Sequence, residues 1–103
     1  MINWGPDYPD PGANVNPFTD YKAKSIAYRN GWDDPIATKA HEAELIADPA
    51  KRVAAYKEIT DYVLHNGPYV VLYQPSELFG LRSNVKGFNW SSIGWAELAS
   101  VTK

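Results

Sequence analysis

Apolar residues recur at helical spacing in the middle of the chain. Four of them lie three or four positions apart, as on one face of a helix: Ile36, Ala40, Ala43 and Ala47. Asp33, Asp34 and Pro35 come directly before this stripe. An aspartate followed by proline is a typical helix start, because the carboxylate accepts free backbone N–H groups and proline fits the first turn. The pattern predicts a helix that begins at this point.

A second apolar face follows a second start signal, Asp48-Pro49. Its members keep the helical period: Val53, Tyr56, Ile59 and Val63. His65 and then Asn66-Gly67-Pro68 end the pattern, since glycine and proline stop helices and a histidine suits the negative end of the helix dipole. A second helix is therefore predicted between these signals.

From Tyr69 the period changes. Residues 69–73 are continuously apolar and rich in β-branched and aromatic side chains, which is typical of a strand buried on both faces. Shorter strands are expected at residues 77–81 and 85–90, with a turn at Ser83-Asn84 between them. This order of elements predicts an α/β or α+β fold with two helices and several short strands.

The remaining segments carry weaker patterns. Residues 5–17 hold four prolines, each of which lacks a backbone N–H, so a loop is expected there. Residues 18–32 are mixed and polar, with a turn at Asn30-Gly31. The tail from Ser91 is expected to be irregular and to be anchored by Trp95.

The predicted strand at residues 69–73 raises a question about the sheet to which it belongs. A strand buried on both faces needs neighbouring strands, and the 103 residues supply few candidates. The length suits one domain with one core. Part of the sheet is therefore expected to be absent, as in a fragment of a larger protein.

Composition narrows the class of protein. The chain is 45% hydrophobic and 21% charged with a net charge of −2, which suits a globular protein and argues against a nucleic-acid binder. It lacks cysteine, which excludes disulfides and cysteine-based sites, and no apolar run is long enough for a membrane span. Aromatic residues make up 14% of the chain, more than one small core needs. They indicate either a binding site or packing against a missing region.

The stretch NWGPDYPDP, residues 3–11, combines acids with aromatic residues in a proline-stiffened segment. Asp7 lies beside Trp4 and Tyr8, a setting in which a carboxylate could hold a cationic ammonium group. The same carboxylate could instead accept backbone N–H groups in a turn. Asp7 and Asp10 could also form a carboxylate pair of the kind that glycosidases use, although aspartate next to proline more often has a capping or turn role.

Other chemistry has little support in the sequence. His41 and His65 are the two histidines, each on a predicted helix and without a metal-ligand spacing. No glycine-rich phosphate loop and no nucleophile motif occur. We therefore expect no metal, no cofactor and no enzymatic activity.

Several motifs occur in an order that resembles a known family: WGPDYPDP, then Asp48-Pro-Ala-Lys-Arg52, Tyr56-Lys-Glu-Ile59, Gly67-Pro-Tyr-Val-Val-Leu-Tyr73 and Asn84-Val-Lys-Gly-Phe88. Together they resemble the C-terminal part of the peptide-type (family 5) extracellular solute-binding proteins of bacterial ABC importers. The resemblance covers essentially the whole chain. Each motif by itself is weak, and their shared order makes the match specific. The family is much longer and has two lobes that close on a ligand, so the resemblance implies a fragment.

The resemblance also implies a ligand site. In peptide-binding members, the acid three residues after the tryptophan pairs with the N-terminal ammonium of the ligand, which here corresponds to Asp7. The backbone of Asn3 and Gly5 would hydrogen-bond an extended peptide as an added strand, and Trp4 would line a side-chain pocket. Pro6 removes one N–H from that ladder, and some members bind nickel chelates, sugars or opines instead.

The resemblance further implies an organisation and a set of partners. Residues 1–74 would belong to the C-terminal lobe, and residues 75–103 would form the hinge crossover and strands that return to the N-terminal lobe. The implied partners are a peptide or other small solute, the permease subunits in the membrane and the rest of the binding protein, with no nucleic acid. The implied location is periplasmic or lipoprotein-anchored outside the cell. The alternative from the residues is a small carbohydrate-binding module or glycoside hydrolase that uses Asp7 and Asp10.

Overall fold

The computed structural model describes residues 2–103. Within them, helices hold 42% of the chain and two short strands pair in a sheet. The described residues divide into two compact units. One is Asp10–Val71, and the other is Leu72–Lys103 with the described part of Met1–Pro9. The coarse prediction of mixed helices and short strands, compatible with an α+β fold, is confirmed.

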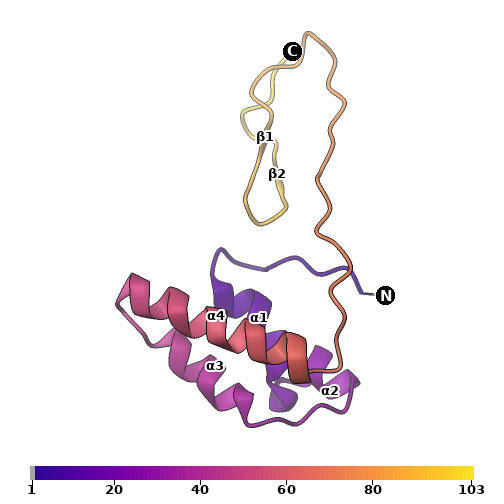
Figure 1. Cartoon of the computed structure of the whole chain (residues 1–103). Coiled ribbons are helices and arrows are strands. Elements are labelled where there is room, and N and C mark those ends of the chain that lie inside the picture. Colours follow the sequence, from indigo (N-terminus) through magenta and orange to yellow (C-terminus); the bar gives the residue numbers. More distant parts are fainter. Residues whose placement is uncertain (1) are drawn as a thin grey trace. The chain divides into compact units, whose positions relative to one another are not determined.

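The two units differ in their secondary structure (Figure 1). The first contains the helices, in chain order α1 (Pro11–Thr19), the 3-10 helix η1 (Tyr21–Ala23), α2 (Ile26–Arg29), α3 (Ile36–Glu44) and α4 (Pro49–Asn66). The second contains the strands β1 (Asn89–Trp90) and β2 (Ala96–Glu97). None of the described helices is both long enough and apolar enough to cross a membrane.

The two predicted helices, α3 and α4, are present and begin at the predicted signals. At α3, the carboxylate of Asp34 accepts the backbone N–H of Ile36 at 2.8 Å. At α4, the carboxylate of Asp48 accepts the backbone N–H of Lys51 at 2.9 Å. Both aspartates therefore satisfy N–H groups that a helix leaves free in its first turn. α4 ends directly before Gly67, as the stop signal predicts.

The hydrophobic core lies where α3 packs on α4. Its buried residues are Ile36, Ala40, Ala43, Tyr56 and Ile59. For two residues, the prediction that they lie on a buried apolar face is wrong. Ala47 is exposed beyond the end of α3, and Val53 is 71% exposed. At 3.6 residues per turn Val53 lies roughly 90° from the centre of the face that Tyr56 and Ile59 bury, so it points away from α3.

α1 was not expected, because its sequence is rich in proline. The prediction of a loop over residues 5–17 is wrong from Pro11 onward. Asp10 and Pro11 repeat the aspartate–proline start of the other two helices, and Asp10 accepts the backbone N–H of Gly12 at 2.8 Å. Pro17 lies inside the helix, which ends two residues later at Thr19. α1 then packs against both α3 and α4.

Both predicted turns are confirmed. Gly31 in the Asn30-Gly31 turn has a φ of +64°, a conformation that glycine adopts without a steric cost. At the Ser83-Asn84 turn, the backbone N–H of Val85 donates to the carbonyl of Arg82 at 2.9 Å. Both turns therefore lie at the positions that the sequence pattern predicts.

The predicted strand at residues 69–73 is not formed, so that prediction is wrong for this structure. Val70 is 83% exposed, and Val71, Leu72 and Tyr73 are exposed as well. A strand exists only where its backbone N–H and C=O groups bond to a neighbouring strand. The described part of the chain provides no such neighbour for this segment.

Tyr69 is the partly buried member of this segment. Its ring packs edge-on against the rings of Phe18 and Trp32, with centroid separations of 5.3 and 5.5 Å. Its hydroxyl donates to the carbonyl of Phe18 at 3.0 Å, and burial raises the pKa of this hydroxyl. These contacts attach Tyr69, the first residue of the segment, to the helical unit.

The unit with the strands has less sheet than predicted. β1 pairs antiparallel with β2, and Lys86 forms an isolated bridge with Thr102. The strand expected at residues 85–90 is thus present in part, while the one expected at residues 77–81 is absent. The tail after Ser91, expected to be irregular, supplies β2.

Aromatic contacts in this unit involve other residues than expected. The ring of Phe79 packs against Phe88 and Trp90, with centroids 5.2 and 4.6 Å apart. Trp95, predicted to anchor the tail, is 63% exposed, so that prediction is wrong. Its backbone instead closes the turn between β1 and β2, where the N–H of Ser91 donates to the Trp95 carbonyl at 2.8 Å.

Candidate functional site

The predicted ligand segment lies in the part of the chain that precedes α1. Residues 2–6 carry no regular secondary structure, and the chain bends from Asp7 to Asp10. Asn3, Gly5 and Asp7 are exposed, whereas Trp4 is partly buried. Within residues 2–103 the carboxylate of Asp7 forms no hydrogen bond or ion pair, so it is accessible to a cationic partner.

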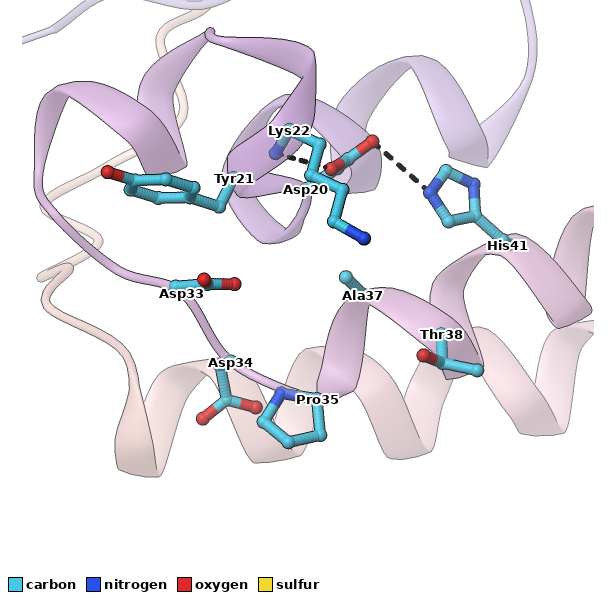
Figure 2. A pocket seen from close by; sticks show the side chains of 9 residues that line it. All are labelled: Asp20, Tyr21, Lys22, Asp33, Asp34, Pro35, Ala37, Thr38 and His41. Carbon is cyan, nitrogen blue, oxygen red and sulfur yellow. Dashed lines mark hydrogen bonds and ion pairs between the residues drawn. The ribbon is translucent and has the colours of Figure 1, made fainter.

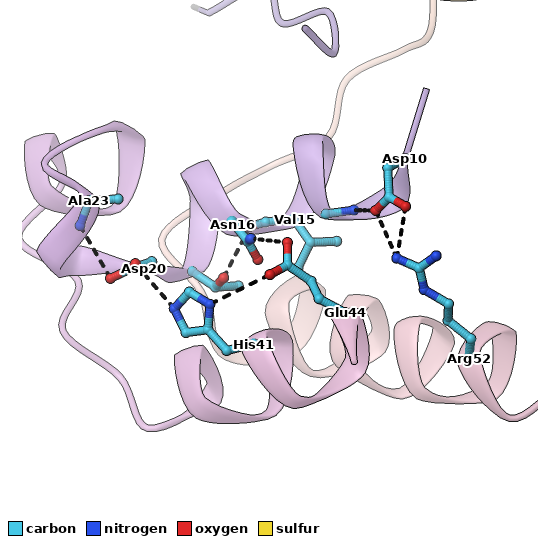
Figure 3. Close-up of polar contacts among 10 residues, drawn as sticks. Asp10, Val15, Asn16, Asp20, Ala23, His41, Glu44 and Arg52 are labelled. Atoms are coloured by element: carbon cyan, nitrogen blue, oxygen red, sulfur yellow. Dashed lines mark hydrogen bonds and ion pairs between the residues drawn. The ribbon is translucent and has the colours of Figure 1, made fainter. Parts of the chain in front are cut away.

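Asp10, three residues later, has a different environment. Its carboxylate accepts the backbone N–H of Gly12, and Nη2 of Arg52 on α4 donates to both of its oxygens at 2.9 and 2.8 Å (Figure 3). The Gly12 hydrogen bond and the guanidinium of Arg52 together hold the pKa of Asp10 below its usual value, against the smaller opposing effect of partial burial. Asp10 is therefore a helix cap, as its place before Pro11 suggests, and also the ion-pair partner of Arg52.

Arg52 is held from its other side by Tyr56. The guanidinium carbon lies 5.4 Å from the centre of the Tyr56 ring, within the range of a cation–π contact. Tyr56 is a buried member of the core, and Arg52 and Asp10 are each less than one-third exposed. The ion pair thus joins the start of α1 to the core of the helical unit. Ion pairs with this degree of burial are screened less by solvent than surface pairs.

Replacing Asp10 by asparagine should reduce stability in a pH-dependent manner. The lowered pKa means that the contribution of Asp10 is present above its unfolded value of about 3.9 and is lost as the pH falls through its lower folded value. We expect the free energy of unfolding to fall by about 1 kcal/mol near neutral pH, and the variant and wild type to converge as the pH falls below the lowered pKa of Asp10 in the folded protein. Urea unfolding followed by circular dichroism at several pH values measures this difference.

A matched control is Glu58→Gln, which removes an exposed carboxylate paired with Lys39. Exposed pairs of this kind contribute little, so its unfolding curve should stay close to that of the wild type. A difference between Asp10→Asn and wild type that stays constant from neutral to acidic pH would contradict the assigned ion pair.

A second polar cluster connects α1 and α3. Nε2 of His41 lies 3.2 Å from the carboxylate of Asp20, and Nδ1 lies 3.9 Å from Glu44 (Figure 3). The amide of Asn16 donates to the other oxygen of Glu44 at 2.6 Å. These contacts cross-link neighbouring helices at their polar edges. They give His41 a role in holding the two helices together.

An open pocket of about 510 Å³ lies beside this cluster (Figure 2). It is lined by Asp20, Tyr21, Lys22, Asp33, Asp34, Pro35, Ala37, Thr38 and His41. Two of the acids that line the pocket already accept hydrogen bonds from other residues of the protein. Asp20 accepts the backbone N–H groups of Lys22 and Ala23, and Asp34 accepts the backbone N–H of Ile36 at the start of α3 and the hydroxyl of Tyr62 at 3.3 Å.

The lining of this pocket does not indicate a particular ligand chemistry. Asp20, Asp34 and His41 already make contacts within the fold, and the described residues contain no group of three or more His, Asp or Glu that could hold a metal ion. Asp7 and Asp33 are both exposed and each lies next to an aromatic residue in the sequence, and the described residues give neither carboxylate a hydrogen bond or an ion pair. The geometry by itself does not rank them, and Asp7 is the candidate that the sequence motif favours.

The capping role of Asp10 agrees with its position before Pro11, whereas its ion-pair partner was not predicted. The ligand role of Asp7 stays a prediction. Arg52 lies 42 residues away in the sequence, on a helix that was predicted. A usable signal for α1 was present, because Asp10-Pro11 matches the start of the other helices. No pattern of neighbouring residues indicates which side of α4 faces the N-terminus of α1.

The chain matches no protein-family profile, no curated protein and no solved structure.

Proposed function

We propose that this chain is the C-terminal part of a family 5 solute-binding protein that captures a peptide or similar small solute for an ABC importer. The proposal rests first on the order of motifs along the whole chain. The observation that carries the ligand site is the free, exposed carboxylate of Asp7, three residues after the partly buried Trp4. A carboxylate that no group of the described chain neutralises is suited to bind an ammonium group.

The exposed segment after α4 supports the proposal that further chain belongs to this protein. Val70, Val71, Leu72 and Tyr73 are apolar and exposed, and this composition is typical of a strand buried on both faces. Contiguous exposed apolar residues mark a surface that another element covers. In the proposed protein, strands from earlier in the longer chain would pair with this segment.

The alternative of a glycoside hydrolase that uses Asp7 and Asp10 has less support. A glycosidase pair needs one protonated carboxyl group and one ionised carboxylate that is free to face the substrate. The lowered pKa of Asp10 fits only the ionised member, and Gly12 and Arg52 already bond the oxygens that this role needs. Binding without chemistry, followed by lobe closure and delivery to a permease, therefore agrees better with these contacts.

Replacing Asp7 by asparagine in the full-length protein tests the proposal. The probe is unblocked trialanine, which has a free ammonium group and small side chains. The asparagine keeps the shape of the side chain and removes its charge. We expect the affinity measured by calorimetry to fall by about 10-fold to 100-fold, the range for losing a hydrogen bond between charged groups.

N-acetyl trialanine provides the matched ligand control. Because it lacks the ammonium group, it should bind weakly to the wild type and be insensitive to Asp7→Asn. Glu58→Gln, which removes an exposed acid on α4, should bind trialanine as the wild type does. Unchanged trialanine affinity in Asp7→Asn would contradict the proposed contact. Hydrolysis of a glycoside that is lost in both Asp7 and Asp10 variants would instead favour the alternative.

A further inference from the structure

The segment that follows α4 has unpaired backbone groups that could join a strand. Residues 69–82 carry no helix, strand or turn, and their trace runs extended (Figure 1). Within the described part of the chain, the N–H and C=O groups of residues 69–73 form no backbone hydrogen bond. Val70 and Val71 are 83% and 72% exposed. A neighbouring strand would satisfy these backbone groups and cover the apolar side chains.

The sequence of this segment is complementary to a second copy of itself. Around Val71 the five residues read Tyr-Val-Val-Leu-Tyr in one direction and Tyr-Leu-Val-Val-Tyr in the other. In an antiparallel pair centred on Val71, Tyr69 lies opposite Tyr73 of the second copy. Val70 lies opposite Leu72 in the same way. Aromatic residues are thus opposite aromatic ones and aliphatic residues opposite aliphatic ones, which is the self-complementarity that a two-fold interface needs.

No charge opposes this pairing. Residues 68–76 contain no charged side chain, and the net charge of the whole chain is only −2. Edge strands that avoid self-association typically carry lysine, another charge or proline. Here the prolines, Pro68 and Pro75, lie outside the five residues. A neutral, β-rich segment without proline or glycine has the composition of segments that pair between chains.

The possible hydrogen bonds of the pair are limited at both ends of the segment. If the two copies of Val71 exchange N–H and C=O groups, the end residues of the segment do so as well, because hydrogen-bonded pairs alternate along an antiparallel ladder. The next such pair would join Gly67 to Pro75. Pro75 has no N–H, and the N–H of Gly67 already donates to the carbonyl of Val63 at 2.8 Å. The ladder is therefore confined to residues 69–73.

We propose that residues 69–73 of two copies of this chain pair as antiparallel strands around a two-fold axis at Val71. Tyr69 attaches the start of each strand to its own helical unit, so antiparallel pairing leaves the two helical units at opposite ends of the ladder. Two five-residue strands bury less than the roughly 1,200 Å² of a stable complex, so the dimer is weak and depends on concentration.

This inference concerns the 103-residue chain and does not rest on the proposed function. Where strands of a longer protein cover residues 69–73, the pairing between copies does not form. Trialanine binding is measured in the full-length protein, so that test and the tests below fail or succeed independently.

Sedimentation velocity of the 103-residue chain tests the association. The apparent mass should rise from that of one chain toward that of two between about 10 µM and about 1 mM, the range in which unpaired strand edges associate. Val71→Lys should stay monomeric over this range, because it places two like charges directly opposite each other. Leu45→Lys is the matched control. It adds the same charge at an 85% exposed residue of the helical unit and should dimerise as the wild type does.

Two results of this experiment would overturn the proposal. One is a wild type that stays monomeric up to about 1 mM, and the other is a Val71→Lys variant that dimerises as the wild type does. Val71 is exposed and lies outside the helices, so the far-UV circular dichroism of the variant should match that of the wild type.

Single cysteines test the register, since the chain contains none of its own. In the proposed pair the two copies of residue 71 lie opposite each other, within the Cα separation of about 4.4 to 6.8 Å that a disulfide needs. The two copies of residue 70 are diagonal neighbours about 7 to 8 Å apart. With oxidised glutathione, which takes up the two electrons that the thiols lose, Val71→Cys should cross-link about 10-fold faster than Val70→Cys.

Val70→Cys is a close control, because Val70 is at least as exposed as Val71 and adjacent to it. Parallel pairing in register would place every residue opposite its own copy, so both variants would then cross-link at similar rates. That result, or growth into large particles without a discrete dimer, would overturn the two-fold arrangement.

Discussion

Replacing Ile59 by alanine is expected to destabilise the helical unit by about 2 to 5 kcal/mol, the range for large-to-small substitutions in a core. Ile59 is 2% exposed and packs in the cluster between α3 and α4. The substitution removes apolar surface from the core and leaves a cavity that neighbouring side chains fill only in part. Single domains are stable by only about 5 to 15 kcal/mol, so this loss is a large share of the total.

Urea unfolding followed by far-UV circular dichroism measures this effect, because the helices lie in this unit. Val53→Ala on the same helix is the matched control. Val53 is 71% exposed, so its substitution should change stability by less than about 0.5 kcal/mol. The sequence pattern assigns both residues to one apolar face, and the structure separates them. Equal losses for the two variants would contradict the orientation of α4 in the structure.

Replacing Gly87 by alanine is expected to disrupt the pairing of the C-terminal residues. Gly87 has a φ of +71°, which costs an alanine about 1 to 2 kcal/mol. A methyl group at this position would also collide with the backbone carbonyl oxygen of Ser100, which cannot move aside as a flexible side chain can. Together these effects should cost about 2 to 4 kcal/mol of local stability.

Hydrogen exchange at the bridge beside Gly87 measures this loss. The N–H groups of Lys86 and Thr102 each donate to the other residue's carbonyl at 3.0 Å, and both should exchange much faster in Gly87→Ala. Gly80→Ala is the matched control, because a methyl group there meets no atom within 4 Å. Unchanged exchange at Lys86 in Gly87→Ala would show that this part of the chain does not have the described conformation.

Only those features of the candidate site that depend on neighbouring residues could be predicted from the sequence. The tryptophan–acid spacing of Trp4 and Asp7 and the flanking prolines are contained in a few residues, so they identified a charged aromatic segment. The prolines around Asp10 also predicted that the role of Asp10 differs from that of Asp7. The partner that holds Asp10 could not be predicted, because Arg52 reaches it through the packing of α1 on α4.

The sequence by itself determined where α3 and α4 begin, where α4 ends and which turns form, because capping and chain reversal depend on neighbouring residues. The tertiary structure decided which side of α4 is buried, since Val53 and Ile59 belong to one apolar pattern and differ in what packs against them. It also decided that residues 69–73 do not form a strand. Strand formation needs hydrogen-bond partners from elsewhere in a chain, and a segment's own sequence cannot supply them.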